Sequence, residues 1–104
     1  MPDLMTFMAT CRATAMTTED ARAVHAALAS TSERMNADGE AVRYLQSCYL
    51  PSTHTWFGFF AAENPHVVHR IARIAQLSAV EVHGGVEFLA HESVRNPPNT
   101  AKGS

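Results

Sequence analysis

Apolar residues alternate with polar ones, or gather in short bounded runs, in four segments of the chain. Residues 4–11, 41–50 and 55–62 are short and rich in apolar, aromatic and threonine residues, which predicts three strands, the first and third of them buried. In residues 80–88, valine and phenylalanine alternate with charged residues, which predicts a fourth strand with a bulge at its glycine pair.

Two segments between these strands carry apolar residues at helical spacing. Residues 17–36 open with a capping box between Thr17 and Asp20, and their apolar positions fall on one stripe. Residues 64–77 open with an Asn-Pro pair, an N-cap residue followed by a proline at the first helical position. Both segments are therefore predicted to be amphipathic helices.

The order β-α-β-β-α-β is typical of an α+β ferredoxin-like sandwich, in which a four-stranded antiparallel sheet carries both helices on one face. We expect this single domain to span residues 1–95. Residues 96–104 contain two prolines and small polar residues without an apolar period, which predicts a flexible C-terminal tail.

The predicted sheet leaves one face without a helix, and in a monomer that face should be polar. Residues 55–62 and 4–11, however, carry large apolar side chains at both strand parities. A second copy, packed sheet to sheet as a two-fold homodimer, would cover this face and enclose a small pocket. The alternative is a monomer in which residues 89–94 fold back over the sheet.

The composition fits one globular domain, since the chain has 104 residues, 46% of them hydrophobic, and a net charge of −2. No stretch approaches the ~20 apolar residues of a membrane span, and no basic field exists to collect phosphates. Membranes and nucleic acids are therefore not expected as partners. Cys11 and Cys48 show no CxxC spacing and no secretory signal is visible, so we expect a cytoplasmic protein in which both thiols are small buried hydrophobes.

Residues 43–82 resemble a family of small ferredoxin-like proteins of unknown function that includes an actinobacterial nickel-binding protein. The segment reads RYLQSCYLPSTHTWFGFFAAENPHVVHRIARIAQLSAVEV, which is a strand, a polar turn, a strand ending in small residues and a proline-containing helix start. The resemblance implies the fold, a dimer and a metal site. The relative's metal-binding histidines fall here on Ala72 and Leu77, which cannot bind a metal, so its nickel site is not carried over.

Six histidines nevertheless favour a transition-metal site, because imidazole suits nickel, zinc and copper. Glu81, His83 and Glu87 share one face of the last strand, which should be the open side of the sheet. His66 and His69 share one face of the second helix. We predict a metal site that draws on His83, Glu81, His66 and His69. The alternative is that His66 and His69 lie on a solvated polar face and that His83 pairs with a carboxylate at the sheet edge.

A ligand pocket is predicted on the same sheet face, lined by His83, Glu81, Tyr44, Cys48 and Trp56. Strand aromatics can bind a flat apolar ligand, although they can equally be core. A covered histidine beside carboxylates can act as an acid or base. The chain has no GxSxG elbow and no glycine-rich phosphate loop, so no complete catalytic motif identifies catalytic residues.

Three functions follow from these observations. The first is a homodimer that binds a small molecule or a transition metal such as nickel. The second is a dimeric α+β barrel enzyme, monooxygenase- or isomerase-like, that acts on a small hydrophobic compound with His83 paired to Tyr44 or Tyr49 as the acid/base group. The third is an interaction module whose sheet face binds another protein.

Overall fold

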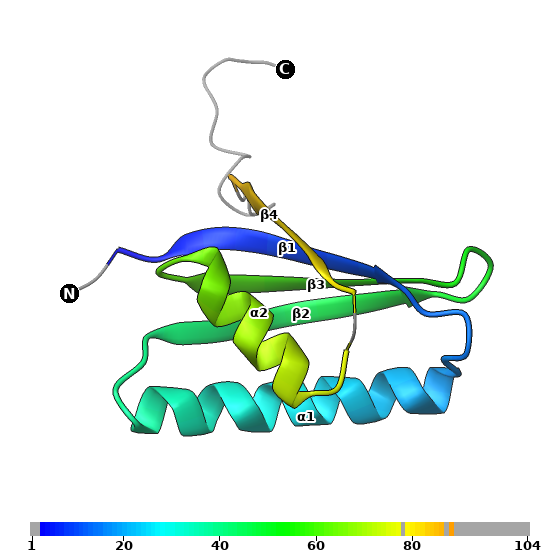
Figure 1. Ribbon diagram of the computed structural model, residues 1–104, viewed down its shortest axis with the longest axis horizontal. Coiled ribbons are helices and arrows are strands. Elements are labelled where there is room, and N and C mark those ends of the chain that lie inside the picture. Colours follow the sequence, from blue (N-terminus) through cyan, green and yellow to red (C-terminus); the bar gives the residue numbers. More distant parts are fainter. Residues whose placement is uncertain (1–2, 78, 87, 89–104) are drawn as a thin grey trace, which may run out of the picture.

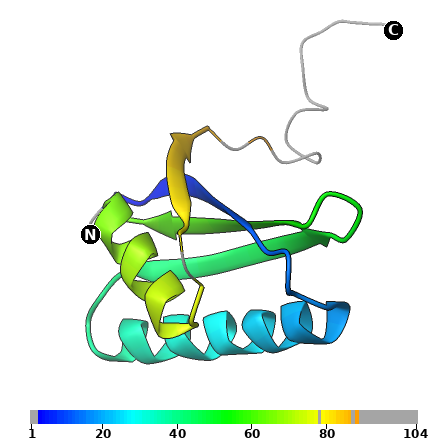
Figure 2. The same ribbon diagram turned by 45° about the vertical axis from the view of Figure 1, so that its right-hand side comes forward.

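The computed structural model describes residues 3–77, 79–86 and 88. Its elements, in chain order, are β1 (Met5–Arg12), α1 (Thr18–Ala37), β2 (Val42–Leu50), β3 (Thr55–Ala62), α2 (Pro65–Ile74) and β4 (Glu81–Gly85). The strands form one antiparallel sheet in the order β2-β3-β1-β4, and both helices lie on one side of it (Figures 1 and 2). This arrangement confirms the predicted ferredoxin-like α+β fold.

Both helices begin where the sequence predicts. The Thr17 side chain accepts a hydrogen bond from the Asp20 backbone N–H, and the Asp20 carboxylate accepts one from the Thr17 N–H, each at 3.0 Å. These bonds satisfy backbone donors that the first turn of a helix leaves unpaired. In α2, the side chain of Asn64 accepts from the backbone N–H of Val67, and Pro65 occupies the first turn.

The core lies between the sheet and the two helices. It is formed by side chains from one face of β1, β2 and β3 and from the inner faces of the helices. The largest fully buried side chains are Trp56, Phe60, Leu28, Ile71, Val42 and Val68. The prediction that both cysteines are buried is half correct. Cys11 is buried on the helix side of β1, whereas Cys48 is exposed on β2. The difference arises because Cys48 lies on the face of the sheet that no helix covers.

The last strand differs from the prediction in length and regularity. β4 ends at Gly85, and Val86 and Phe88 lie outside it with about four-fifths of each side chain exposed. The glycine pair pairs with β1 without a register shift, so the predicted bulge does not occur there. Neither glycine has a positive φ, so the pair follows an ordinary strand conformation. The predicted fold-back of residues 89–94 and the tail over 96–104 lie outside the described residues.

A bulge does occur in β2, where the pairing with β3 shifts between Tyr44 and Gln46. Such a bulge places one extra residue on the bulged strand and changes which residues face each side of the sheet. Tyr44 pairs with Phe60, while Ser47 pairs with Gly58. Both therefore face the helices, although their positions have opposite parity in the sequence.

The indole of Trp56 lies against Gly58, two residues along the same face of β3. A Cβ atom added to Gly58 would lie 2.3 Å from the indole Cη2. We therefore expect Gly58→Ala to lower the free energy of unfolding by about 1–3 kcal/mol, because the indole must leave its packed position. Urea denaturation followed by circular dichroism measures the change. Gly85→Ala is the matched control, because nothing lies within 4 Å of a Cβ there, and an equal loss in both variants would contradict this explanation.

Candidate functional site

The face of the sheet opposite the helices is lined by alternate residues of all four strands. In an antiparallel ladder, directly paired residues project to the same side of the sheet. Met8 pairs with Phe59 and with His83, and Thr10 pairs with Phe57 and Glu81. We call this surface the open face, and its residues are Thr6, Met8, Thr10, Arg12, Arg43, Gln46, Cys48, Leu50, Thr55, Phe57, Phe59, Ala61, Glu81, His83 and Gly85.

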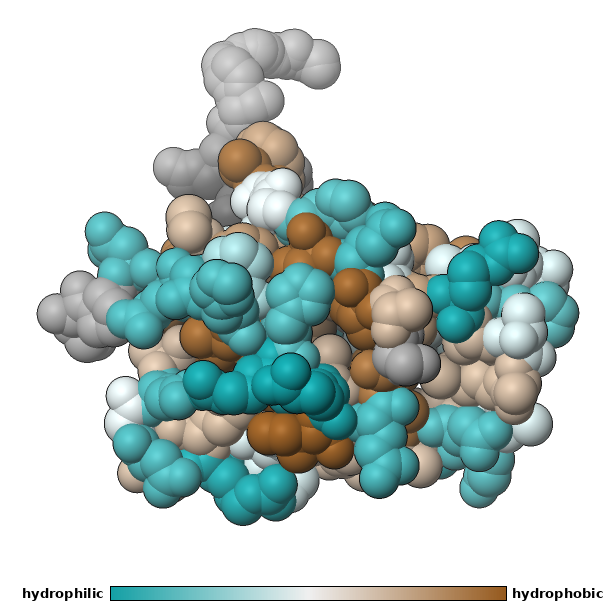
Figure 3. Space-filling model, viewed as in Figure 1, coloured by the Kyte–Doolittle hydropathy of each residue, from teal (hydrophilic) through white to brown (hydrophobic). Residues whose placement is uncertain are grey.

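The centre of the open face is apolar, and its charged residues lie around that centre, with Arg12 at the end of β1, Arg43 on β2 and Glu81 on β4. Met8, Phe57 and Phe59 lie on the two central strands and are only partly buried by their neighbours. The opposite side of the molecule, which α2 covers, is mostly hydrophilic on its outer surface (Figure 3). In a monomer the uncovered face of a sheet is normally polar, so the apolar centre of the open face calls for something that covers it.

The side chains of Glu81 and His83 lie beside each other at the β4 edge of the open face. The Nε2 atom of His83 lies 3.4 Å from the Oε1 atom of Glu81, and the two side chains are 56% and 76% exposed. A pair this exposed contributes about 1 kcal/mol or less, because water screens it. The arrangement agrees with the alternative prediction, in which His83 pairs with a carboxylate at the sheet edge. Glu87 lies outside the described residues.

The five residues of the predicted ligand pocket do not line one cavity. His83, Glu81 and Cys48 lie on the open face, whereas Tyr44 and Trp56 face the helices. In a regular β2, Tyr44 and Cys48 would share a face because their numbers have the same parity. The bulge between them places Tyr44 on the helix side and Cys48 on the open face.

The tyrosine partner proposed for His83 is also on the other side of the sheet. Tyr49 faces the helices, and its hydroxyl donates to the backbone carbonyl of Met16 at 2.6 Å. Tyr44 contacts His25 of α1, with their ring centroids 5.3 Å apart. His83 therefore has no tyrosine partner within its own chain among the residues described. The hydroxyl of Tyr44 lies beside His25 instead.

The four residues of the predicted metal site do not converge. His66 and His69 are exposed on α2, in the helix layer, whereas His83 and Glu81 lie across the sheet on the open face. Within residues 3–77, 79–86 and 88, no group of three or more histidine, cysteine, aspartate or glutamate side chains could hold a metal ion. The sequence could not show this, because the count of histidines carries no information on which layer each one occupies.

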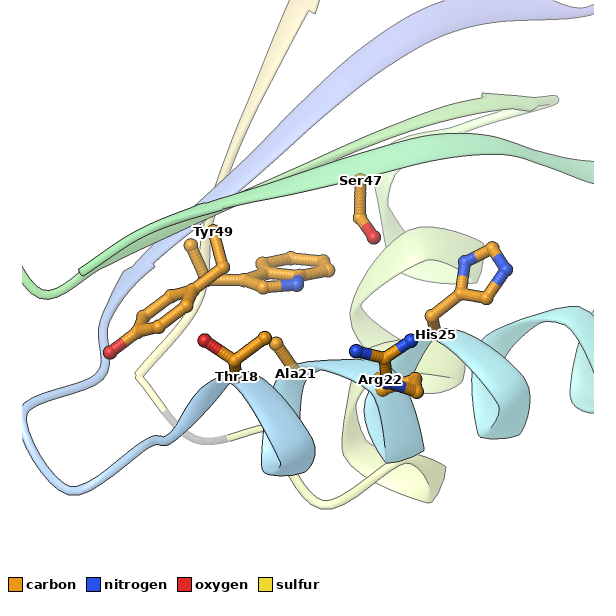
Figure 4. Close-up of a pocket in the computed structure, with 7 residues that line it drawn as sticks. Thr18, Ala21, Arg22, His25, Ser47 and Tyr49 are labelled. Atoms are coloured by element: carbon orange, nitrogen blue, oxygen red, sulfur yellow. The ribbon is translucent and has the colours of Figure 1, made fainter.

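A pocket of about 310 Å³ lies on the helix side, between α1 and β2. Figure 4 shows side chains of α1 on one side of the space and Ser47 and Tyr49 of β2 on the other. Its lining residues are Thr18, Ala21, Arg22, His25, Ser47, Tyr49 and Trp56. Trp56 is the one residue of the predicted ligand pocket that lines it. We call this space the helix-side pocket.

A chain of hydrogen bonds borders the helix-side pocket. The Nδ1 atom of His25 lies 2.6 Å from the hydroxyl oxygen of Tyr44, and that hydroxyl donates to the Oγ atom of Ser47 at 2.7 Å. Burial raises the pKa of the Tyr44 phenol, while the bond to Ser47 acts in the opposite direction. The phenol therefore stays protonated at neutral pH. The sequence did not indicate that Tyr44 would link His25 with Ser47, because only the packing of α1 on β2 brings these residues together.

Comparisons with known proteins found no relative of this chain. It matches no family model, no curated protein and no solved structure. The resemblance of residues 43–82 to the ferredoxin-like family stays a prediction. Neither helix in the described part of the chain has the length and apolar character needed to cross a membrane.

Proposed function

We propose that this protein is a homodimer that packs through the open face and binds a small apolar molecule between its two sheets. The observation that carries the proposal is the apolar centre formed by Met8, Phe57 and Phe59 on the uncovered side of the sheet. A solvated sheet face normally carries polar residues, and large apolar patches mark interaction sites. Two-fold symmetry lets one such patch bind a second copy of itself.

The rows of the open face favour a second copy as the partner. Met8 of β1 and Phe59 of β3 are paired and lie at the same position along the strands. A two-fold axis parallel to the strands keeps that position and lays β1 of one protomer over β3 of its partner. Met8 then meets Phe59 of the second copy, so the two apolar centres coincide.

The size of the open face also fits self-association. Strands lie ~4.8 Å apart and rise ~3.3 Å per residue, so this face covers roughly 450 Å² per protomer. Two such faces bury about 900 Å², close to the ~1,000 Å² at which specific interfaces begin. Val86 and Phe88 follow β4 directly and add exposed apolar area. We expect a reversible dimer whose population depends on concentration.

Small side chains beside the bulky centre explain where a ligand would lie. Thr6 pairs with Ala61, one row along from the pair formed by Met8 and Phe59. When the bulky rows of two sheets meet, they hold the two backbones apart. The row of small side chains does not fill the space that remains between the sheets. Met8, Phe59 and Ala61 give that space an apolar side, which suits a small hydrophobic compound, and Arg43 lies at its β2 end.

Phe59→Glu is expected to abolish dimer formation, because it places a charge at the centre of the interface. Sedimentation velocity should show the parent dimerising as its concentration rises, with the variant remaining monomeric at about tenfold higher concentration. Ile74→Glu is the matched control, because Ile74 is 49% exposed on α2, in the other layer, and this variant should dimerise as the parent does. Circular dichroism checks that both variants are folded, and Phe57→Lys repeats the test if the first variant is not.

A parent that stays monomeric at every concentration, or a Phe59→Glu variant that dimerises equally, would overturn the proposed dimer. Native mass spectrometry of untagged protein, with elemental analysis, tests the ligand. An organic adduct on the dimer that Phe59→Glu loses supports the proposed pocket. A dimer without any adduct limits the function to self-association and contradicts the ligand-binding part.

A further inference from the structure

We propose that the helix-side pocket binds a small aromatic carboxylate, with its carboxylate between Arg22 and Ser47 and its ring against Trp56. The proposal is independent of the proposed dimer, because the pocket lies on the helix side of the sheet. Its volume of about 310 Å³ is at the lower end of the range for ligand sites, which restricts the ligand to a compound about the size of benzoate.

The charge of the helix-side pocket favours an anion. Its lining includes Arg22 and His25 and contains no acidic residue. The acidic group nearest to Arg22 is Glu19, whose Oε1 lies 3.8 Å from the arginine Nε, with both side chains largely exposed. A pair this long and exposed leaves the guanidinium charge available to a ligand. Arginine also matches a carboxylate with two parallel hydrogen bonds, which makes it the better recognition group for a planar acid.

The hydrogen-bond chain directs a further donor into the pocket. The hydroxyl hydrogen of Tyr44 is used in the bond to Ser47, so the bond between Tyr44 and His25 needs the hydrogen on Nδ1 of His25. Ser47 then accepts from Tyr44 and keeps its own hydroxyl hydrogen free. Because Ser47 lines the pocket, that hydrogen can be donated to an oxygen of the ligand. The arrangement presents a donor to the ligand and suits an acceptor such as a carboxylate.

The apolar part of the lining suits an aromatic ring. Trp56 contributes its indole, Tyr49 its ring and Ala21 its methyl group. Trp56 is 1% exposed, so its indole is held in the core and only a small, fixed part of it borders the pocket. Aromatic rings pack favourably against one another, in offset or edge-to-face geometry. The pocket thus combines a cationic and hydrogen-bonding side with an aromatic side, as a benzoate-like ligand requires.

The single tryptophan of the chain makes the test direct, because Trp56 lines the pocket and is the only source of indole fluorescence. Sodium benzoate and sodium phenylacetate are titrated into the full chain, with benzamide as the uncharged comparison and sodium chloride at matched ionic strength. We expect a saturable change with the carboxylates and none with the salt. Benzamide should bind roughly ten- to a hundredfold more weakly, since it lacks the charge that Arg22 recognises.

Arg22→Gln is expected to raise the Kd for benzoate roughly tenfold or more, and Ser47→Ala about two- to fivefold. Arg73→Gln, on the exposed side of α2, is the matched control and should bind as the parent does. The monomeric Phe59→Glu variant should also keep its affinity, which separates this proposal from the proposed dimer. Absence of a saturable response to both carboxylates, equal binding of benzamide, or an unchanged Kd in Arg22→Gln would each overturn the proposal.

Discussion

Trp56→Ala is expected to lower the free energy of unfolding by about 3–5 kcal/mol, which is a large part of the ~5–15 kcal/mol available to a domain of this size. The indole is the largest fully buried side chain of the protein, and it lies against Gly58 beneath α1. Its removal leaves a cavity that β3 itself cannot close, because Gly58, two residues along the same face, has no side chain to fill it. Urea denaturation followed by far-ultraviolet circular dichroism measures the loss, since the variant has no tryptophan fluorescence.

Phe57→Ala is the matched control for this prediction. Phe57 is the adjacent residue of β3, but it lies on the open face and is only partly buried. At concentrations at which the protein is monomeric, its replacement should cost less than that of Trp56, about 1–2 kcal/mol, because part of its ring already faces water. Equal losses in the two variants would contradict the assignment of Trp56 to the core and Phe57 to the uncovered side.

Cys48 is expected to react with a thiol reagent at least about a hundredfold faster than Cys11 in the native protein. Cys11 is buried, and burial raises the pKa of its thiol, so at neutral pH a smaller fraction is the reactive thiolate. Only 7% of Cys11 is exposed, so a reagent also reaches its sulfur less often. Cys48 is exposed on the open face.

The Cys11→Ser and Cys48→Ser variants each keep one of the two thiols. Their reaction with an aromatic disulfide reagent, followed over time, therefore assigns one rate to each cysteine. In urea the difference should disappear, because both thiols then meet the same solvent. The proposed dimer adds a second expectation, namely that the Cys48 rate falls as protein concentration rises. Fast reaction of Cys11 in the folded chain would show that the helix side of β1 is open to solvent.

Local signals predicted the elements and their order well. The capping box at Thr17 and Asp20 and the Asn64-Pro65 start act within one turn of chain, so neighbouring residues decide them. The alternation of β3 also assigned Trp56 and Phe57 to opposite faces. These features need no knowledge of which segments become neighbours in the folded chain.

Strand parity is where prediction from the sequence failed. The sequence places Tyr44 and Cys48 in one pocket on the open face, and the bulge between Tyr44 and Gln46 puts them on opposite faces. No glycine or turn residue marks that bulge, whereas the Gly84-Gly85 pair, which is a usual signal, pairs regularly. The geometry of β2 is set by packing against α1 and β3, which a single strand's sequence does not contain.

The candidate sites show the same division. His25 and Tyr44 are 19 positions apart and come together only because α1 lies over β2. His66 and His69, by contrast, were grouped with His83 on residue type alone, and the sheet separates them. Chemistry within one element can be predicted from spacing, and chemistry between layers requires the structure.

The bulge in β2 also has a consequence for assembly. β2 and β4 are the two outer strands of the sheet, and an outer strand presents unpaired N–H and C=O groups to which strands of other molecules can add. The irregular pairing at Tyr44 twists β2, and β4 has only five residues. Neither edge offers a long, flat template. Growth of fibrils by strand addition is thereby opposed, and contact between copies is directed to the faces of the sheets.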